Sequence, residues 1–307
     1  MIKVMLSQKG NIAIIFVLLG ILTTLSITLL TVHKIVSQQT KNRNDMSEDD
    51  LSMYEVPKDV LAVINQARAE DRPVLGIRTD GPTFHIPILM YHYVEHVKDT
   101  GDKIRISLNT VPEVLDGQIQ TLIKAGYNFI TASDLADILD GIKNPPSKPV
   151  MLTFDDGYRD FYTDAFPIIK KYKVRAVNYV ISGFMNKPNN LTVDQLKEIA
   201  KSGLVEIGVH TVNHLALKGI SATQLAKEVG YSKVQLEELL QFPVTAFAYP
   251  YGSFDINAIQ AVKQAGFRTA VSTIAGTSVN NSVRFLAYRL RPGGRTGQSL
   301  LNLIEKN

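Results

Sequence analysis

Strand-like and helix-like runs alternate along this chain from Phe84 onward, and this alternation limits the fold more than any other feature. The strand-like runs are Ile86–Tyr91, Asn128–Ile130, Val150–Phe154, Ala176–Ile181, Val205–Val209, Ala246–Tyr249 and Thr269–Ser272. The segments with helical spacing are Pro112–Ala125, Ala132–Leu139, Ala165–Tyr172, Val193–Lys201, Ala222–Leu240 and Asn257–Ala265. Several of these helices end before a glycine, which suits a left-handed cap. Strands that alternate with helices predict an α/β fold with a parallel sheet, and we expect an irregular (β/α)7-type barrel.

The segment that precedes this region suggests a membrane anchor. Residues 11–32 carry no charged side chain, and a stretch of that length can cross the hydrocarbon core of a bilayer. A cleaved signal peptide, with secretion of the remainder, is the alternative, but its apolar stretch is normally shorter. We therefore divide the chain into an N-terminal flank (1–10), a transmembrane anchor (11–32), a stalk with room for one short helix (33–83) and a folded domain (84–307). Charges on the two sides of the anchor are nearly balanced, so they do not set its orientation.

Composition excludes several classes of site. The 307 residues contain no cysteine, which excludes disulfides, cysteine-bound zinc and a thiol nucleophile. The net charge is only +4, and no basic block interleaved with aromatic residues suggests binding to nucleic acid.

Two polar segments follow predicted strands directly. Thr153-Phe154-Asp155-Asp156-Gly157 comes after one strand, and His210-Thr211-Val212-Asn213-His214 comes after another. Taken singly, the first is typical of a turn and the second of a chance histidine pair. Parallel strands present their carboxyl ends at one edge, where α/β proteins place their active sites. One carboxylate and two imidazoles could hold a divalent cation there with an open position, and a second carboxylate would lie beside it.

These two segments, with Tyr249-Pro250-Tyr251-Gly252 and Ile88-Leu89-Met90-Tyr91-His92-Tyr93, resemble motifs of a known family. The chain is similar, from about Ile86 to Arg291, to the polysaccharide deacetylases with a NodB-homology domain (carbohydrate esterase family four). The last of these segments is characteristic of the branch that deacetylates poly-β-1,6-N-acetylglucosamine of bacterial biofilms. The resemblance implies that residues 84–307 form a polysaccharide deacetylase catalytic domain.

The resemblance also implies roles for individual residues. Asp156, His210 and His214 would bind one divalent metal, with zinc expected and Co2+ or Ni2+ as alternatives. Asp155 would be the catalytic base. The backbone N–H of Tyr251 would help to hold the oxyanion while its side chain lines the acetyl pocket, although an ordinary turn is the plain alternative.

The general acid requires a separate argument. Most family members supply a late histidine, but no histidine follows His214 in this chain. His92 ends an apolar run, as the late histidine does elsewhere, and a permuted strand order would bring it to the site. We expect its imidazole across the metal from Asp155; a buried structural histidine is the alternative.

Two departures from the family pattern concern the tuning of the base. Ala248 stands where the family often carries an arginine, and the later Asp-Trp pair is missing because the chain has no tryptophan. Arg289 could replace the missing arginine at the substrate or oxyanion side of the site, or it could be a surface cation.

The sequence thus predicts a hydrolase of linear amides, an N-deacetylase acting on an N-acetylglucosamine polymer. Peptidoglycan, chitin-type oligomers and O-acetylated xylan are alternative substrates. We expect a single-pass protein in the cell membrane with its catalytic domain on the extracellular side, where polysaccharide synthase or export machinery would be a partner. An inactive carbohydrate-binding protein is a remote alternative, because a binding module needs no such set of catalytic residues.

Overall fold

A computed structural model describes residues 82–306. The predicted flank, anchor and nearly all of the predicted stalk lie outside the described residues. Between residues 82 and 306, no helix combines the length and apolar character needed to cross a membrane.

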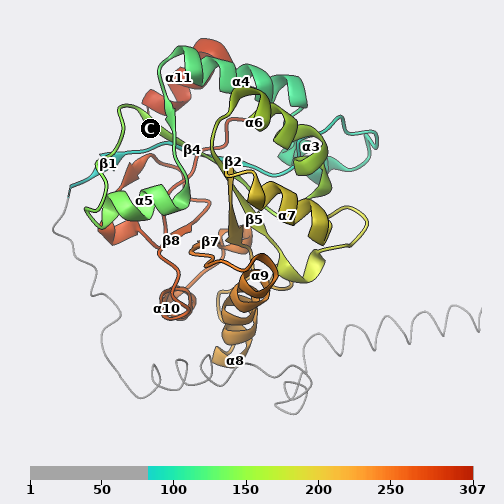
Figure 1. The fold of residues 1–307 in the computed structure, drawn as a ribbon, viewed down its shortest axis with the longest axis vertical. Helices are drawn as coiled ribbons and strands as arrows, with labels where there is room; N and C mark the ends of the chain where they lie inside the picture. Colours follow the sequence, from blue (N-terminus) through green and yellow to red (C-terminus); the bar gives the residue numbers. More distant parts are fainter. Residues whose placement is uncertain (1–81, 307) are drawn as a thin grey trace, which may run out of the picture. The chain divides into compact units, whose positions relative to one another are not determined.

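A parallel sheet forms the centre of the domain (Figure 1). Its strands are β2 (Ile88–Tyr91), β3 (Asn128–Phe129), β4 (Pro149–Phe154), β5 (Ala176–Val180), β6 (Val205–Val209), β7 (Ala246–Ala248) and β8 (Thr269–Val271). They lie in the order β2-β4-β5-β6-β7-β8, and β3 pairs with β4. The parallel sheet predicted from the sequence is therefore confirmed. A separate antiparallel pair, β1 (Phe84–His85) and β9 (Ser278–Val279), was not predicted.

The sheet curls into a half-barrel, and an irregular segment bridges its two edges. The N–H of Leu290 donates to the carbonyl of Ile88 at 2.8 Å, and the N–H of Met90 donates to the carbonyl of Leu290 at 2.9 Å. On the β8 side, the N–H of Ala287 donates to the carbonyl of Ala270, and the N–H of Ser272 donates to the carbonyl of Ala287, both at 2.9 Å. Residues 287–290 thus stand where a regular closing strand would be expected. This segment carries Arg289 to the interior of the curled sheet.

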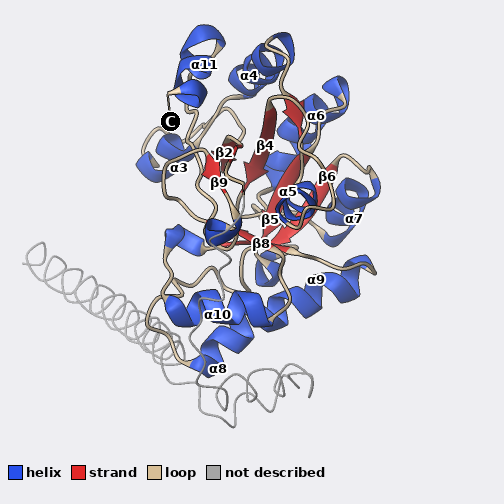
Figure 2. Ribbon diagram, turned by 90° about the vertical axis from the view of Figure 1, so that its left-hand side faces the viewer, coloured by secondary structure: helices blue, strands red, loops and turns tan. Residues whose placement is uncertain are grey.

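Helices surround the sheet (Figure 2). They are α3 (Lys103–Leu108), α4 (Pro112–Lys124), α5 (Ala132–Leu139), α6 (Phe166–Tyr172), α7 (Val193–Lys201), α8 (Ala222–Leu225), α9 (Ser232–Leu240), α10 (Ile256–Gln264) and α11 (Gly297–Glu305). Helix α5 differs from the others in packing on the inner cluster of the sheet. The predicted bounds of α5 and α7 are confirmed, and both helices begin with a capping box that the sequence signals through a threonine. The predicted helix over 222–240 contains a π-helical segment, η4 (Ala226–Tyr231), between α8 and α9. A second π-helical segment, η2 (Phe161–Ala165), precedes α6, and neither α3 nor α11 was predicted.

Alternate residues of β4 enter two different cores. On β4, Leu152 and Phe154 belong to the large cluster beneath the outer helices, whereas Met151 belongs to a second cluster inside the curled sheet. Helix α5 supplies Leu135 and Ile138 to that inner cluster and lies in front of the strands in Figure 2. The inward position of Met151 repeats two and four residues later, so Asp155 also faces the interior.

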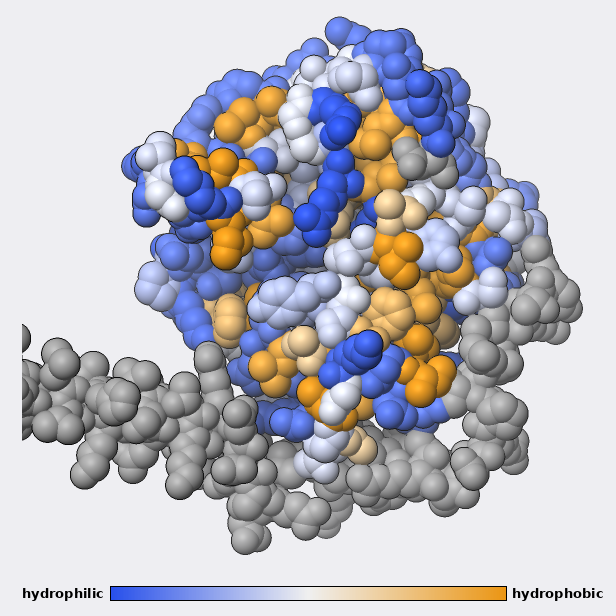
Figure 3. Space-filling view, turned by 180° about the vertical axis from the view of Figure 1, so that it is seen from behind, coloured by the Kyte–Doolittle hydropathy of each residue, from blue (hydrophilic) through white to orange (hydrophobic). Residues whose placement is uncertain are grey.

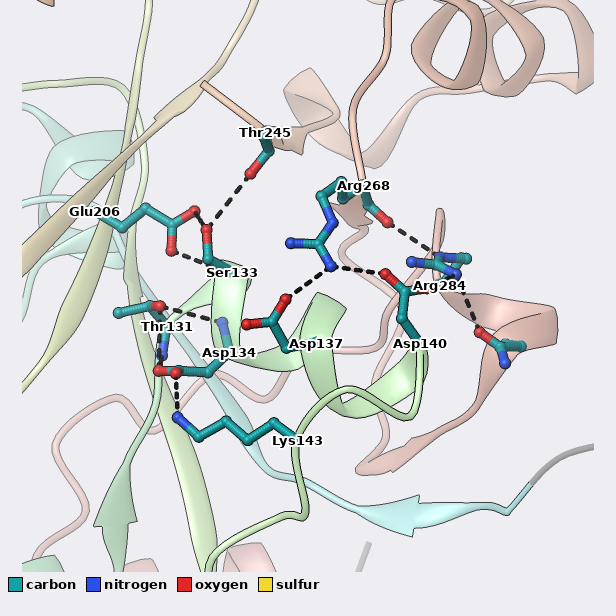
Figure 4. Close-up of polar contacts among 11 residues, drawn as sticks. Thr131, Ser133, Asp134, Asp137, Asp140, Lys143, Glu206, Thr245, Arg268 and Arg284 are labelled. Atoms are coloured by element: carbon teal, nitrogen blue, oxygen red, sulfur yellow. Dashed lines mark hydrogen bonds and ion pairs between the residues drawn. The ribbon is translucent and has the colours of Figure 1, made fainter. Parts of the chain in front are cut away.

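Polar contacts fix α5 at the amino-terminal end of the sheet (Figure 4). Glu206, near the start of β6, accepts hydrogen bonds from the N–H and the hydroxyl of Ser133, both at 2.8 Å. Arg268 pairs with Asp137 of α5 at 2.8 Å and with Asp140, the residue that caps this helix, at 2.7 Å. Because active sites of such folds lie at the opposite end, we interpret this network as stabilising. On the face seen in Figure 3, apolar side chains form separate patches among polar ones.

Candidate active site

The predicted site residues meet at the carboxyl end of the sheet. Asp155 and Asp156 follow β4, His210 follows β6, and His92 follows β2. Because β2 pairs with β4 in parallel, His92 and Asp155 emerge side by side. The structure therefore brings together residues that lie far apart in the sequence.

Asp156, His210 and His214 form a compact cluster suited to a metal ion. The Nε2 atoms of His210 and His214 lie 3.3 and 3.2 Å from Oδ1 of Asp156. One ligand atom from each residue lies within 4.8 Å of the others. Asp156 and His210 are buried, and His214 is partly exposed, which leaves one side of the cluster open.

The outer nitrogens of both imidazoles are already engaged. Nδ1 of His210 lies 2.8 Å from the carbonyl oxygen of Ala248, which can only accept, so Nδ1 carries the proton. Nδ1 of His214 lies 3.0 Å from the hydroxyl oxygen of Tyr251, which can accept or donate; we take it as the acceptor, because Nε2 of His214 then presents a lone pair to the cluster. Both Nε2 lone pairs then face Asp156, as in metal-binding histidines that are oriented by an outer partner.

The carboxylate oxygen Oδ1 of Asp156 shows whether the cluster suits a metal ion. This oxygen is buried and has no hydrogen-bond partner, and such an atom is costly unless something else satisfies it. Burial alone would raise the pKa of Asp156, but the hydrogen bonds and positive charges of the two imidazoles, when these are protonated, outweigh burial and hold that pKa well below its usual value. A carboxylate and two imidazole lone pairs that converge on one point fit a divalent cation such as zinc.

The backbone of both motifs is strained where it carries the ligands. Asp156, Thr211 and His214 have φ angles of 75°, 66° and 57°, and the left-handed region is especially unfavourable for a β-branched threonine. Such residues cost on the order of 1–3 kcal/mol each and cluster at functional sites. Gly157 also has a positive φ of 63°, and a Cβ there would lie 3.1 Å from Cγ1 of Val180.

Arg289 lies beneath Asp155 and is 1% exposed, so the surface alternative does not hold. Its Nη1 and Nη2 atoms lie 2.8 Å from Oδ1 and Oδ2 of Asp155. Further hydrogen bonds run to the hydroxyl of Thr153 and the carbonyl of Ser272. Arg289 therefore binds the carboxylate of Asp155 from the interior of the curled sheet.

The pair with Arg289 determines the charge of Asp155. Burial, the largest single influence, would raise the pKa of this carboxyl, but the combined attraction of Arg289 and the nearby imidazoles lowers it. Asp155 is thus held ionised without being a ligand of the metal cluster. An ionised, buried carboxylate beside a metal site is suited to accept a proton.

His92 lies beside Asp155 rather than across the cluster from it. Its Nε2 is 3.9 Å from Oδ2 of Asp155, which is too long for a hydrogen bond. The imidazole is therefore not committed to Asp155. Burial lowers the pKa of His92, although Asp155 and Asp156 act in the opposite direction.

Tyr251 has an exposed side chain, with 69% of its surface accessible. Its φ angle of 59° lies in the left-handed region, and its ring lies 4.4 Å from that of His214. The contact that the structure shows is with the outer nitrogen of His214, so the side chain orients a candidate ligand. An arrangement of its backbone N–H toward an oxyanion stays a prediction.

Sequence reasoning did not identify three partners of the site. The carbonyl of Ala248 orients His210, the hydroxyl of Thr153 contacts Arg289, and Glu228 binds the backbone between the two histidines. A contact made by a backbone carbonyl cannot be predicted from the residue type, because every residue has this group. Glu228 lies inside a predicted helix, and no local pattern marks it.

One known protein family matches the part of the chain that carries most of these residues. The family model described as Polysaccharide deacetylase matches residues 142–270. That range includes the two aspartates, both histidines of the cluster and Tyr251, whereas His92 and Arg289 lie outside it. The placement of the latter two therefore rests on the structure.

Three proteins illustrate the similarity. YxkH of Bacillus subtilis (strain 168), whose name assigns it provisionally to the polysaccharide deacetylases, is 28% identical over 260 residues, covering 84% of this chain and 90% of that protein. The poly-β-1,6-N-acetyl-D-glucosamine N-deacetylase of Escherichia coli (strain K12) is 26% identical over 299 residues, covering 81% of this chain and 44% of that protein. The deacetylase PplD of Streptococcus pyogenes, solved in complex with acetate, matches with a TM-score of 0.67 and 32% identity, over 73% of this chain and 99% of that one.

Proposed function

Because the chain belongs to the polysaccharide deacetylase family and is a hydrolase of that kind, we propose that it removes N-acetyl groups from poly-β-1,6-N-acetyl-D-glucosamine with the help of one zinc ion. The buried, unpartnered Oδ1 of Asp156 between two Nε2 atoms is the observation that carries the metal dependence. The choice of polymer is supported by the Escherichia coli relative and by the segment from Ile88 to Tyr93.

Asp156, His210 and His214 would hold the cation. When bound, it would polarise the acetyl carbonyl and make a nearby water more acidic. The outer contacts with Ala248 and Tyr251 would keep both imidazoles in the tautomer that binds a metal.

Proton transfers then fall to residues at the rim. Asp155, held ionised by Arg289, would accept a proton from the water that attacks the acetyl carbon. His92 would give a proton to the nitrogen as the carbon–nitrogen bond breaks, so that acetate and a free amine leave. The lost arginine and Asp-Trp pair of the family would thus be compensated in part by Arg289, which tunes the base from a different segment.

A panel of substrates tests the choice of polymer. We expect the purified chain to release acetate fastest from poly-β-1,6-N-acetylglucosamine, with chitin oligomers, peptidoglycan and acetylated xylan as comparators. A clear preference for one of the comparators would keep the deacetylase and reject the polymer. Equal inactivity on all four, with zinc bound, would favour the inactive binding protein.

The location is part of the proposal. An extracellular polymer and the uncharged segment 11–32 support a membrane-anchored enzyme that faces outward, near the machinery that makes or exports the polymer. Protease added to intact cells should then remove the folded domain. Cleavage only after lysis would reverse the orientation.

A further inference from the structure

Glu228 lies behind the turn that joins the two histidines of the cluster. Glu228 is 2% exposed, and it belongs to the π-helical segment η4, not to the sheet or its rim. Its Oε2 accepts hydrogen bonds from the N–H groups of Val212 and Asn213 at 3.1 and 2.8 Å. Its Oε1 accepts a third from Nδ2 of Asn213 at 2.8 Å.

These contacts complete the hydrogen bonding of the turn. The next N–H, that of His214, donates to the hydroxyl oxygen of Thr211 at 2.9 Å. Three successive N–H groups, from Val212 to His214, are therefore bound by acceptors, two of them by one carboxylate. Consecutive N–H groups around a carboxylate form a recognised kind of anion-binding concavity, which the chain here fills from within.

The turn needs such support because its conformation is unfavourable by itself. Thr211 and His214 both lie in the left-handed region, with φ angles of 66° and 57°, and strained residues persist only where the surroundings hold them. Without an acceptor at Glu228, two buried N–H groups would lose their partner, and a rearrangement of the turn would then lower its free energy. A rearranged turn would move the Nε2 atom of His214 relative to that of His210.

The helix that carries Glu228 departs from α-helical geometry at this position. A π-helical turn interrupts the run from α8 to α9, and such turns occur often at functional sites. The buried hydroxyl of Ser232 lies 2.7 Å from the carbonyl oxygen of Glu228 and 2.9 Å from that of Val229. This hydroxyl bonds carbonyls of the π turn and so stabilises the geometry that presents Glu228 to the turn.

We propose that Glu228 is a positioning residue for the metal centre, which holds the His210–His214 turn in the conformation that binds the cation. The inference rests on the proposed metal-dependent function and adds to it a residue that contacts neither metal nor substrate. Residues that orient ligands from behind typically contribute about 10- to 100-fold to metal affinity.

The test compares Zn2+ dissociation constants and melting temperatures of the metal-free, purified full-length chain and its variants. Glu228→Met keeps the length of the side chain and removes both acceptors, so we expect Zn2+ affinity to fall about 10- to 100-fold. Glu228→Gln should bind within about threefold of wild type, because its oxygen can serve the backbone N–H groups while the amide of Asn213 turns over to face its nitrogen.

Glu206→Met is the matched control. Glu206 also accepts a backbone N–H and a side-chain donor, both from Ser133, but near the opposite end of β6 from His210. Its loss should lower the melting temperature and leave Zn2+ affinity unchanged. A merely structural Glu228 would behave in the same way, and that outcome would overturn the inference.

Two further results keep the inference and the proposed function separable. If Glu228→Met does not fold, Asn213→Ala provides the test, because it removes one hydrogen bond of Glu228. This variant should bind Zn2+ about two- to tenfold more weakly. Unchanged affinity would reject the positioning role. A wild-type chain that binds no Zn2+ rejects the proposed function as well, whereas a wild-type chain that binds it no more tightly than Glu228→Met rejects only the role of Glu228.

Discussion

Replacing Arg289 with methionine should both destabilise the domain and change how its activity depends on pH. The guanidinium forms two hydrogen bonds of 2.8 Å with Asp155, and both side chains are almost fully buried. Methionine fills much of the same volume without a charge. The substitution therefore leaves the carboxylate of Asp155 buried and without its principal partner.

The expected magnitude follows from this burial. Removing one partner of a buried ion pair typically costs about 3–5 kcal/mol, because the other charge stays uncompensated. The pKa of Asp155 lies below its usual value in the native protein, so the contribution of the pair is present above the unfolded pKa and lost as pH falls through the folded pKa. In the variant, burial dominates and raises the folded pKa, so the deficit should be largest near neutral pH and shrink on acidification.

Urea unfolding of the metal-free chain at several pH values measures this deficit, and Arg291→Met is the control. Arg291 is exposed and lies two residues away on the same segment, so its loss should change stability little. Activity of the Arg289 variant should fall on the order of 10²- to 10⁴-fold near neutral pH, because Asp155 is then largely protonated, and recover in part at higher pH. An unfolding free energy like that of wild type, or an unmoved acidic limb of the rate profile, would refute the reasoning.

Three other substitutions separate the roles of individual residues. Asp155→Asn should keep its zinc in metal analysis but lose about 10²- to 10⁴-fold in acetate release, because an amide cannot accept the proton; activity within about threefold of wild type would mean that another group is the base. His92→Ala should also keep its zinc and lose the high-pH limb of the rate profile, since the wild-type rate falls as the acid loses its proton with rising pH; an unchanged profile would exclude His92 as the acid. Gly208→Ala should lower the stability measured by thermal unfolding by about 1–3 kcal/mol through overpacking, because the new Cβ would lie 2.4 Å from Cδ1 of Tyr179. Gly294→Ala is the control and should leave stability unchanged, because its Cβ would meet no atom within 4 Å. Equal effects of the two substitutions would argue against tight packing of the barrel interior.

Much of the fold could be predicted because its signals are local. Apolar runs of strand length and threonine capping boxes placed the parallel sheet, α5 and α7 close to their observed bounds. The two motifs that supply the candidate metal ligands follow strand ends, so their convergence is a consequence of parallel topology.

The parts that escaped prediction depend on contacts between distant segments. The closing segment 287–290 has no regular strand pattern, so nothing local indicates that Arg289 would be buried against Asp155. The position of His92 depended on β2 pairing with β4, which brought it beside Asp155 rather than across the cluster. The π-helical turn at Glu228 has the same apolar spacing as an ordinary helix, and its role becomes visible only in its contacts with the histidine turn.

Acetate release from the N-acetylglucosamine polymer, before and after removal of bound metal, tests the central claim most directly. We expect the purified chain to lose its activity with a strong chelator and to regain it when zinc is restored, while His210→Ala stays inactive and binds no zinc. Undiminished acetate release by a chain shown to be free of metal would contradict the account.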